Sequence, residues 1–221
     1  MGKTYKIIVC GKKALGKTTL LENLIYNNTV NNNHHNRLTN SPSITTVSQE
    51  RYFSTIEDIY VACWEKDKGI KEKLRFYDTK GMESAKDSES INQSRHLFSS
   101  CDGAVLIFSS LDPDSIQCIE KIKLEIEKSK DKKEICHFIL IDNTIPGAHI
   151  NEALTPNNRE AIRSDLQGRL RAAVYELSGN DKRDTLCKPF TDLATLISQI
   201  PSKGSMGLVK PFKPKVFSSN R

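Results

Sequence analysis

The chain has 221 residues, of which 37% are hydrophobic and 27% charged, and its formal net charge is +6. The length fits one domain with an insertion or a tail better than two domains, because an independent core needs roughly 100 residues or more. Many of the cations lie in the last residues, which include no acid, so the nearly neutral remainder argues against a nucleic-acid-binding face.

The sequence carries no readable signal for a membrane or for export. No run approaches the roughly 20 apolar residues of a membrane span, the first residues lack the apolar run of a signal peptide, and the last offer no cysteine for prenylation. We therefore expect a cytoplasmic protein with no stable membrane anchor. Its scattered cysteines form no C-x-x-C pair and are expected to be buried and reduced: Cys10, Cys63, Cys101, Cys118, Cys136 and Cys187.

The chain opens with a pattern of strand, loop and helix. Lys6 to Cys10 form a β-branched run that stops at glycine, and leucines at helical spacing follow from Leu20. Residues 27–50 are rich in asparagine and exceed the roughly 12 to 15 residues beyond which a structureless loop is unusual, so we expect a flexible insertion. Its histidine pair, residues 34–35, has no third metal ligand nearby, which disfavours a metal site.

Further strands follow the insertion. Residues 59–64 and 74–77 are extended segments on either side of the turn signal Asp67-Lys68-Gly69, which predicts a hairpin. Continuous apolar runs at 104–108 and 138–141 are typical of parallel strands that are covered on both faces.

The remaining pattern completes an α/β fold. Helical spacing over 116–126 separates the two apolar runs, and a last strand at 172–175 precedes a last helix over 186–197. Strands that alternate with helices predict a doubly wound sheet over residues 1–200. Residues 201–221 are rich in proline, glycine, serine and lysine and are expected to form a basic disordered tail.

A phosphate-binding motif follows the first strand. Residues 11–18 match G-x-x-x-x-G-K-[ST] between a predicted strand and a predicted helix, which is the context that the mechanism requires. Backbone N–H groups would wrap a phosphate, Lys17 would reach the outer phosphates and Thr18 would ligate Mg²⁺. The nucleotide-binding candidates in this loop are Gly11, Lys12, Lys13, Ala14, Leu15, Gly16, Lys17, Thr18 and Thr19.

A second motif follows the hairpin. Asp78-Thr79-Lys80-Gly81 has the form D-x-x-G, in which Asp78 can hold the Mg²⁺ shell and the Gly81 amide can contact a third phosphate. On its own the motif is weak, because an ordinary turn at the end of a strand has the same form. Its place after a phosphate loop favours the nucleotide site.

These motifs give the chain a resemblance to a known family. Residues 55–60 resemble the effector segment of Ras, which implies that Thr55 contacts magnesium and the third phosphate. Residues 68–81, 131–134 and 188–191 resemble the kappa-B-Ras subfamily of Ras-like proteins. The likeness covers most of residues 3–200 and fails in the asparagine-rich insertion, which lengthens the first switch, and in the tail.

The resemblance implies both a fold and a function. The fold is that of a Ras-like P-loop NTPase, with a mostly parallel six-stranded sheet, one antiparallel hairpin strand and helices on both faces. The cofactors are GTP or GDP with Mg²⁺, and the metal ligands are Thr18, Thr55 and Asp78. Kappa-B-Ras proteins bind inhibitors of NF-kappa-B and restrain their degradation, and they associate with the GTPase-activating complex for Ral. Both are therefore expected partners.

The residues for hydrolysis depart from Ras. Met82 stands where Ras has a glutamine that orients the attacking water, and a thioether offers that water no useful hydrogen bond. Lys13 replaces a glycine near the third phosphate, where a side chain would crowd the water and any arginine finger. We expect very slow hydrolysis, so enzyme status stays open and no catalytic residue is assigned.

The base-reading residues are also altered. Ras-like proteins carry N-K-x-D after the fifth strand, and the nearest match is residues 142–145, with Ile145 at the carboxylate position. Loss of that contact costs on the order of 1.5 to 3 kcal/mol unless Asp142 or Asn143 compensates. The segment that starts at Glu176 resembles a second base-side loop of Ras, in which Ser178 and Gly179 are the candidates.

Three functional interpretations remain open. A nucleotide-dependent switch fits the phosphate and magnesium residues, and a protein-binding module with little or no nucleotide dependence fits the altered hydrolysis and base motifs. A P-loop phosphotransferase is disfavoured, because neither an arginine-bearing lid nor a second substrate pocket is readable. We favour the switch, loaded with GTP and slow to hydrolyse it.

Overall fold

The computed structural model describes residues 3–26, 57–66, 70–131, 134–144, 156–178 and 181–199, so the predicted 27–50 insertion and 201–221 tail lie outside the described residues. The strands are β1 (Thr4–Gly11), β2 (Glu57–Lys66), β3 (Ile70–Thr79), β4 (Gly103–Phe108), β5 (His137–Thr144) and β6 (Ala173–Ser178). The helices are α1 (Lys17–Tyr26), α2 (Ser88–Ser100), α3 (Pro113–Ser129), α4 (Pro156–Leu170) and α5 (Arg183–Ser198).

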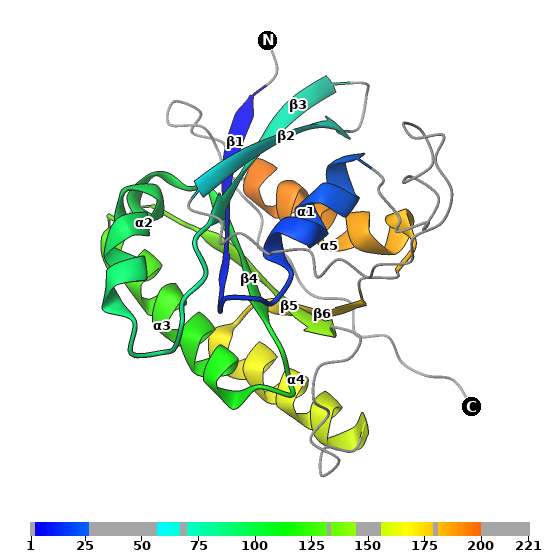
Figure 1. Ribbon diagram of the computed structural model, residues 1–221. Coiled ribbons are helices and arrows are strands. Elements are labelled where there is room, and N and C mark those ends of the chain that lie inside the picture. The colour runs from blue at the N-terminus through cyan, green and yellow to red at the C-terminus, as the bar shows by residue number, and fades with distance from the viewer. Residues whose placement is uncertain are drawn as a thin grey trace, which may run out of the picture.

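The strands form one sheet in the order β2-β3-β1-β4-β5-β6. β2 pairs with β3 in antiparallel fashion, and every other neighbouring pair is parallel. Helices cover both faces, with α1 and α5 on one side and α2, α3 and α4 on the other (Figure 1). The predicted doubly wound sheet with a single antiparallel hairpin strand is therefore confirmed.

Alternate residues of the central strands belong to two separate cores. On β1, Ile7 and Val9 pack on the α1 and α5 side, whereas Ile8 and Cys10 pack on the α2 and α3 side. β4 and β5 follow the same alternation, and the residues of β4 are buried throughout. Because successive side chains of a strand point to opposite faces, a strand covered on both sides needs an unbroken apolar run.

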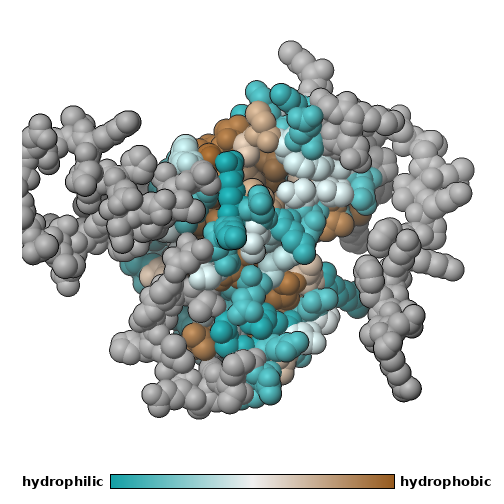
Figure 2. Space-filling view, turned by 90° about the vertical axis from the view of Figure 1, so that its right-hand side faces the viewer, coloured by the Kyte–Doolittle hydropathy of each residue, from teal (hydrophilic) through white to brown (hydrophobic). Residues whose placement is uncertain are grey.

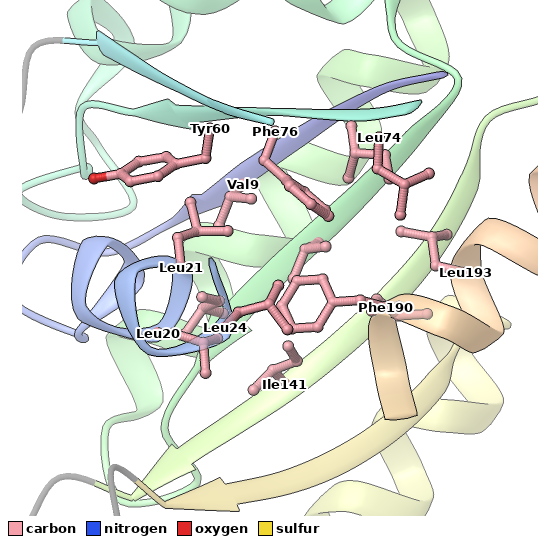
Figure 3. Packing of buried hydrophobic residues seen from close by; sticks show 14 of the residues in the cluster. Val9, Leu20, Leu21, Leu24, Tyr60, Leu74, Phe76, Ile141, Phe190 and Leu193 are labelled. Carbon is pink, nitrogen blue, oxygen red and sulfur yellow. The ribbon is translucent and has the colours of Figure 1, made fainter. Parts of the chain in front are cut away.

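The core under α1 and α5 is filled by leucines and aromatic rings (Figure 3). The rings of Phe76 on β3 and Phe190 on α5 meet edge to face, with centroids 5.5 Å apart and planes at 89°. Leu21 from α1 and Leu193 from α5 lie in the same cluster and are fully buried. This packing holds α1, and so the loop that precedes it, against the sheet.

Two helices were not predicted from the sequence. α2 is rich in serine, and it begins after Asp87, whose side chain accepts a hydrogen bond from the Ser90 N–H at the helix N-terminus. α4 is highly polar and begins at Pro156, a residue suited to the first helical turn. α2 has few apolar residues and buries serines among them, and α4 lacks a clear apolar face, which explains why the sequence pattern missed them.

The surface seen in Figure 2 is mainly hydrophilic, and its hydrophobic patches are small and separated by polar side chains. Within the described ranges, none of the helices is long and apolar enough to cross a membrane. The same part of the chain contains no cluster of three or more histidine, cysteine or acidic side chains that could hold a metal ion. His34 and His35 lie outside it.

Candidate functional site

The phosphate loop joins the end of β1 to the start of α1. Gly11 leaves no room for a side chain, because a Cβ atom would lie 2.2 Å from the backbone oxygen of Ile107. Gly16 adopts the left-handed conformation with φ of +72°, as glycine readily does. Ala14 is also left-handed, with φ of +61°, a conformation that costs a residue with a Cβ roughly 1–2 kcal/mol. The shape of the loop thus depends on a close backbone contact at Gly11 and on left-handed conformations at Ala14 and Gly16.

The backbone N–H groups of this loop suit an anion. Within the described residues, the N–H groups of Ala14, Leu15, Gly16 and Lys17 have no protein acceptor. They precede and begin α1, whose N-terminus adds positive potential. The Leu15 side chain is buried in the core, so only the backbone of that residue can face a ligand.

The ammonium group of Lys17 places a positive charge at the phosphate loop. Its side chain is buried, and its Nζ donates to the Lys12 carbonyl at 3.1 Å. Burial lowers the pKa of this ammonium group, while the nearby Asp78 carboxylate opposes the change. A phosphate beside Lys17 would offset the cost of burying its charge.

Thr18 and Asp78 form the part of the site that suits Mg²⁺. The Thr18 hydroxyl donates to Asp78 Oδ2 at 2.5 Å, while the fully buried Asp78 Oδ1 has no hydrogen-bond partner. Burial raises the pKa of the Asp78 carboxyl, and the Thr18 hydroxyl and Lys17 ammonium oppose the rise. A hard cation with its water shell would satisfy the unpaired oxygen, and hydroxyl and carboxylate are the donors that Mg²⁺ prefers. Thr55, the other predicted metal ligand, lies outside the described residues.

The D-x-x-G segment lies directly on the phosphate loop. A Cβ atom on Gly81 would lie 2.6 Å from both the Lys13 Cα and the Lys17 Nζ, so the close approach requires glycine. Met82 then pairs with the loop by backbone: its N–H donates to the Gly11 carbonyl at 3.1 Å, and its carbonyl accepts from the Lys13 N–H at 2.8 Å.

The Met82 side chain points away from the phosphate loop. It is 2% exposed and packs in the core under α2 and α3 with Ile8, Cys10 and Ile91. The sequence predicted that Met82 has no useful hydrogen bond for a water. The structure adds that the side chain is part of the hydrophobic core.

The two lysines before Ala14 make contacts that the sequence did not predict. Lys12 Nζ pairs with Asp112 at 2.8 Å and with Asp114 at 2.9 Å, both at the start of α3. Lys13 Nζ pairs with Glu83 at 2.7 Å, and both of these side chains are exposed. The Lys12 ammonium group is therefore held by two carboxylates, and the place of Lys12 among the nucleotide-binding residues of the loop stays a prediction. The crowding effect of Lys13 stays a prediction.

On the base side, Asn143 rather than Asp142 faces the phosphate loop. Asn143 Nδ2 donates to the Leu15 carbonyl at 2.8 Å, and a Cβ atom on Gly16 would lie 2.9 Å from the same nitrogen. Neighbouring side chains of a strand point to opposite faces, so Asp142 is directed the other way. If Asn143 is aligned with the asparagine of N-K-x-D, the carboxylate position falls on Pro146 and no longer on Ile145. Both lie outside the described residues.

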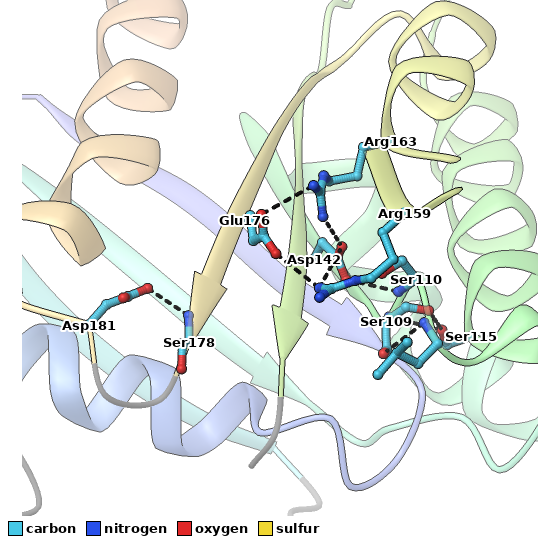
Figure 4. A network of polar contacts seen from close by, with 10 residues as sticks. Ser109, Ser110, Ser115, Asp142, Arg159, Arg163, Glu176, Ser178 and Asp181 are labelled. Atoms are coloured by element: carbon cyan, nitrogen blue, oxygen red, sulfur yellow. Dashed lines mark hydrogen bonds and ion pairs between the residues drawn. The ribbon is translucent and has the colours of Figure 1, made fainter. Parts of the chain in front are cut away.

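Asp142 is the centre of a charged network (Figure 4). Its fully buried carboxylate accepts from the Ser110 N–H at 2.8 Å and from Arg163 at 3.0 Å, and it lies 3.7 Å from Arg159. Both arginines of α4 also pair with Glu176 of β6, at 3.0 Å and 3.2 Å. Of the two residues expected to compensate for the lost base contact, Asp142 is disfavoured, since its oxygens are already engaged by α4 and Ser110, and compensation by Asn143 stays a prediction.

The sequence analysis did not predict this network, although the spacing of its two arginines could have indicated it. Arg159 and Arg163 are four residues apart, the spacing that places two side chains on one face of a helix, but α4 itself was not predicted. The network joins the carboxyl ends of β5 and β6, from which the two base-side loops leave the sheet.

The remaining candidates are only partly placed. Ser178 ends β6, and its N–H donates to the Asp181 carboxylate at 2.6 Å (Figure 4). Gly179 lies outside the described residues. Thr19 is half-buried in the first turn of α1, next to Thr18.

Comparison with known proteins places this site in a family. Residues 6–143 match a family model described as a 50S ribosome-binding GTPase. The NF-kappa-B inhibitor-interacting Ras-like protein 1 of Homo sapiens is 34% identical over 208 residues, which cover 94% of this chain and 93% of that protein. The chain belongs to the NF-kappa-B inhibitor-interacting Ras-like family.

Other members of the NF-kappa-B inhibitor-interacting Ras-like family are similar to this chain at a comparable level of identity. Protein 2 of Gallus gallus is 34% identical over 213 residues, 96% of each chain, and protein 2 of Xenopus laevis is 36% identical over 140 residues, 63% of this chain and 72% of that one. The resemblance inferred from residues 68–81, 131–134 and 188–191 is thereby confirmed. The Ras-like GTPase fold is confirmed as well.

Proposed function

We propose that this chain is an atypical Ras-like protein that binds GTP or GDP with Mg²⁺, hydrolyses GTP very slowly and regulates NF-kappa-B signalling by binding an inhibitor of NF-kappa-B. From the kappa-B-Ras resemblance we extend the proposal to Ral signalling, through the GTPase-activating complex for Ral. The observation that carries slow hydrolysis is the position of Met82. A side chain that is 2% exposed, in the core under α2, does not orient an attacking water.

Nucleotide binding is supported by the geometry of the phosphate loop. The N–H groups of Ala14 to Lys17, the buried Lys17 ammonium group and the unpaired Asp78 oxygen form a set that fits phosphates and a hard cation. Thr18 and Asp78 would hold Mg²⁺, which would neutralise phosphate charge when bound. The protein's own groups orient the phosphates through the loop backbone.

Partner binding is supported by an exposed apolar pair on the edge strand. Ile59 and Val61 of β2 are 48% and 50% exposed, and they lie on one face of the strand because they are two residues apart. Their direct cross-strand neighbours are Tyr77 and Arg75 of β3. Exposed apolar side chains beside a cationic one on the edge strand of a sheet suit contact with another protein.

A second candidate is a protein-binding module that needs no nucleotide. It is favoured by the backbone bonds that join Met82 to Gly11 and Lys13, because these protein contacts hold Gly81 on the loop without help from a phosphate. Such a module would present the same partner surface in every nucleotide state.

The nucleotide retained by the purified full chain tests the proposal. The protein is denatured with acid, and the released nucleotides are quantified by ion-exchange chromatography. Mostly GTP supports the slow GTP-binding protein, and no guanine nucleotide, even after incubation with millimolar GTP and Mg²⁺, contradicts it. Adenine nucleotide would instead support a phosphotransferase.

A binding assay then separates the two candidates. The inhibitor of NF-kappa-B is titrated against the chain loaded with GTP, loaded with GDP, or stripped of nucleotide. Affinity that depends on the nucleotide supports the switch. Equal affinity in all three states supports the module.

A further inference from the structure

Two cysteines meet at the end of the sheet that lies away from the phosphate loop. Cys101 caps the C-terminus of α2, and Cys136 immediately precedes β5. Their sulfur atoms are 3.7 Å apart, although 35 positions separate them in the chain. The contact follows from the fold, because β4 and β5 start side by side with Gly103 opposite His137, and the His137 N–H donates to the Asp102 carbonyl at 3.3 Å.

The two thiols differ in access and in acidity. Cys101 is buried and Cys136 is half-buried, so the pair is reached from the Cys136 side. The hydrogen bond between the two sulfurs lowers the pKa of Cys101 despite burial, and the Lys130 ammonium group, which donates to the Cys101 carbonyl, adds to this effect. The same hydrogen bond and burial raise the pKa of Cys136.

We propose that Cys101 and Cys136 are an oxidation site, a dithiol that a small hydroperoxide converts into an intramolecular disulfide. The sulfur atoms, 3.7 Å apart in the reduced pair, must close to the roughly 2.05 Å of a disulfide. The expectation of buried cysteines is wrong for Cys63, which is exposed. For Cys101 and Cys136, whose sulfurs are already in contact, the proposal replaces the expectation that the thiols stay reduced.

The reaction balances with hydrogen peroxide as the oxidant. The Cys101 thiolate attacks one peroxide oxygen, the O–O bond breaks, and the departing hydroxide takes up the proton that the thiol released, which gives water and a sulfenic acid on Cys101. The Cys136 sulfur then attacks the Cys101 sulfur, an S–S bond forms and the S–O bond breaks. The hydroxyl leaves with the Cys136 proton as a second water, so one peroxide is reduced for each disulfide formed.

The disulfide would join the end of α2 to the start of β5. α2 is the helix that follows the D-x-x-G segment, so oxidation would anchor its C-terminal end covalently. The phosphate loop follows the carboxyl end of β1, whereas Cys101 and Cys136 precede the amino ends of parallel strands. Oxidation therefore leaves the nucleotide-binding groups untouched, and this inference does not depend on the proposed function.

Peptide mapping of the oxidised full chain tests the proposal. The reduced protein is treated with graded hydrogen peroxide, its remaining thiols are blocked with N-ethylmaleimide, and it is digested without reductant for mass spectrometry. Cys63 is exposed and serves as a comparator in the same molecule. We expect the Cys101–Cys136 linked peptide, reversible by dithiothreitol, at lower peroxide than half-oxidises Cys63. Complete oxidation of Cys63 with both partners still free, or oxidised but unlinked, would overturn the proposal.

Two controls separate a folded pair from chance pairing. In denaturant the link between Cys101 and Cys136 should be lost, because only the fold brings the sulfurs together, and an equal yield there would count against the proposal. In Cys136→Ser the Cys101 sulfenic acid has no resolving thiol, so dimedone should trap several-fold more of it than in the unaltered chain. Equal trapping in the two proteins would also overturn the mechanism.

Discussion

The Lys13 N–H donates a hydrogen bond to the Met82 carbonyl at 2.8 Å, and the Met82 N–H donates to the Gly11 carbonyl at 3.1 Å. These bonds join the residue after D-x-x-G to the phosphate loop through backbone atoms alone. The Met82 side chain packs in the core under α2 and α3. Backbone bonds do not depend on the identity of the side chain. Substitution of Met82 is therefore expected to alter the packing of the core and to leave the backbone pairing with the phosphate loop in place.

Met82→Gln is expected to raise single-turnover GTP hydrolysis by less than about tenfold. The new amide enters a largely apolar core, and the variant should lose about 1–3 kcal/mol of unfolding free energy. Met82→Leu is the matched control, because it keeps the core apolar and should cost less than about 1.5 kcal/mol. Rapid-quench kinetics and urea unfolding measure both effects. A Ras-like rate in the glutamine variant would show that its side chain leaves the core.

Lys17→Ala should abolish tight nucleotide retention. The buried ammonium group would make charge-assisted contacts worth about 1.5–3 kcal/mol each, so the affinity for GTP is expected to fall on the order of a hundredfold. Lys71→Ala, at an exposed lysine of β3, is the control and should bind GTP normally. Fluorescent-nucleotide titration measures both variants. Unchanged affinity in Lys17→Ala would remove the phosphate loop from the proposed function.

Asp142→Ala should destabilise the fold without changing base preference. The substitution leaves Arg163 and the Ser110 N–H without their buried partner, which is expected to cost about 3 kcal/mol. Glu176→Gln, at a half-exposed carboxylate of the same network, should cost much less. Chemical unfolding gives the stabilities, and competition between GTP and ATP gives the preference. A shift of that preference in Asp142→Ala would mean that Asp142 reads the base after all.

Ile59→Asp should weaken binding of the NF-kappa-B inhibitor while nucleotide affinity stays unchanged. The charge would lie in the exposed apolar pair of β2, and truncation or charging of a central contact costs about 2 kcal/mol or more, roughly thirtyfold in affinity. Leu124→Asp is the matched control, because Leu124 on α3 is 49% exposed and lies on another surface. Calorimetric titration measures the affinity of both variants for the inhibitor of NF-kappa-B. Equal loss in the two, or none in Ile59→Asp, would place the partner surface elsewhere.

Asp87 should make stability depend on pH in the acid range. Hydrogen bonds from the Ser90 hydroxyl and N–H lower the pKa of this carboxyl from 3.8 to about 2. Because the folded pKa is lower than the unfolded one, the stabilisation is present above about pH 4 and is lost as the pH falls towards 2. Asp87→Asn lacks the titrating group, so the stability difference between the two proteins should shrink across that window. A difference that is independent of pH would contradict this role of the cap.

The sequence by itself determined the fold class and indicated the candidate residues of the phosphate loop. Continuous apolar runs such as 104–108 can be satisfied only between two helical layers, and residues 11–18 carry their chemistry in backbone conformations that glycine permits. These are local properties of the chain, so a short window of sequence contains them. The family resemblance rested on similar local matches.

Tertiary structure alone decided which side chains face one another. It directed Asn143 to the phosphate loop and Asp142 to Arg163, turned Met82 into the core, and brought Cys101 against Cys136. Each of these contacts joins residues far apart in the chain, and neighbouring strand residues differ only in the face to which they point. A one-residue change of register exchanges those faces, and only the packed sheet sets that register.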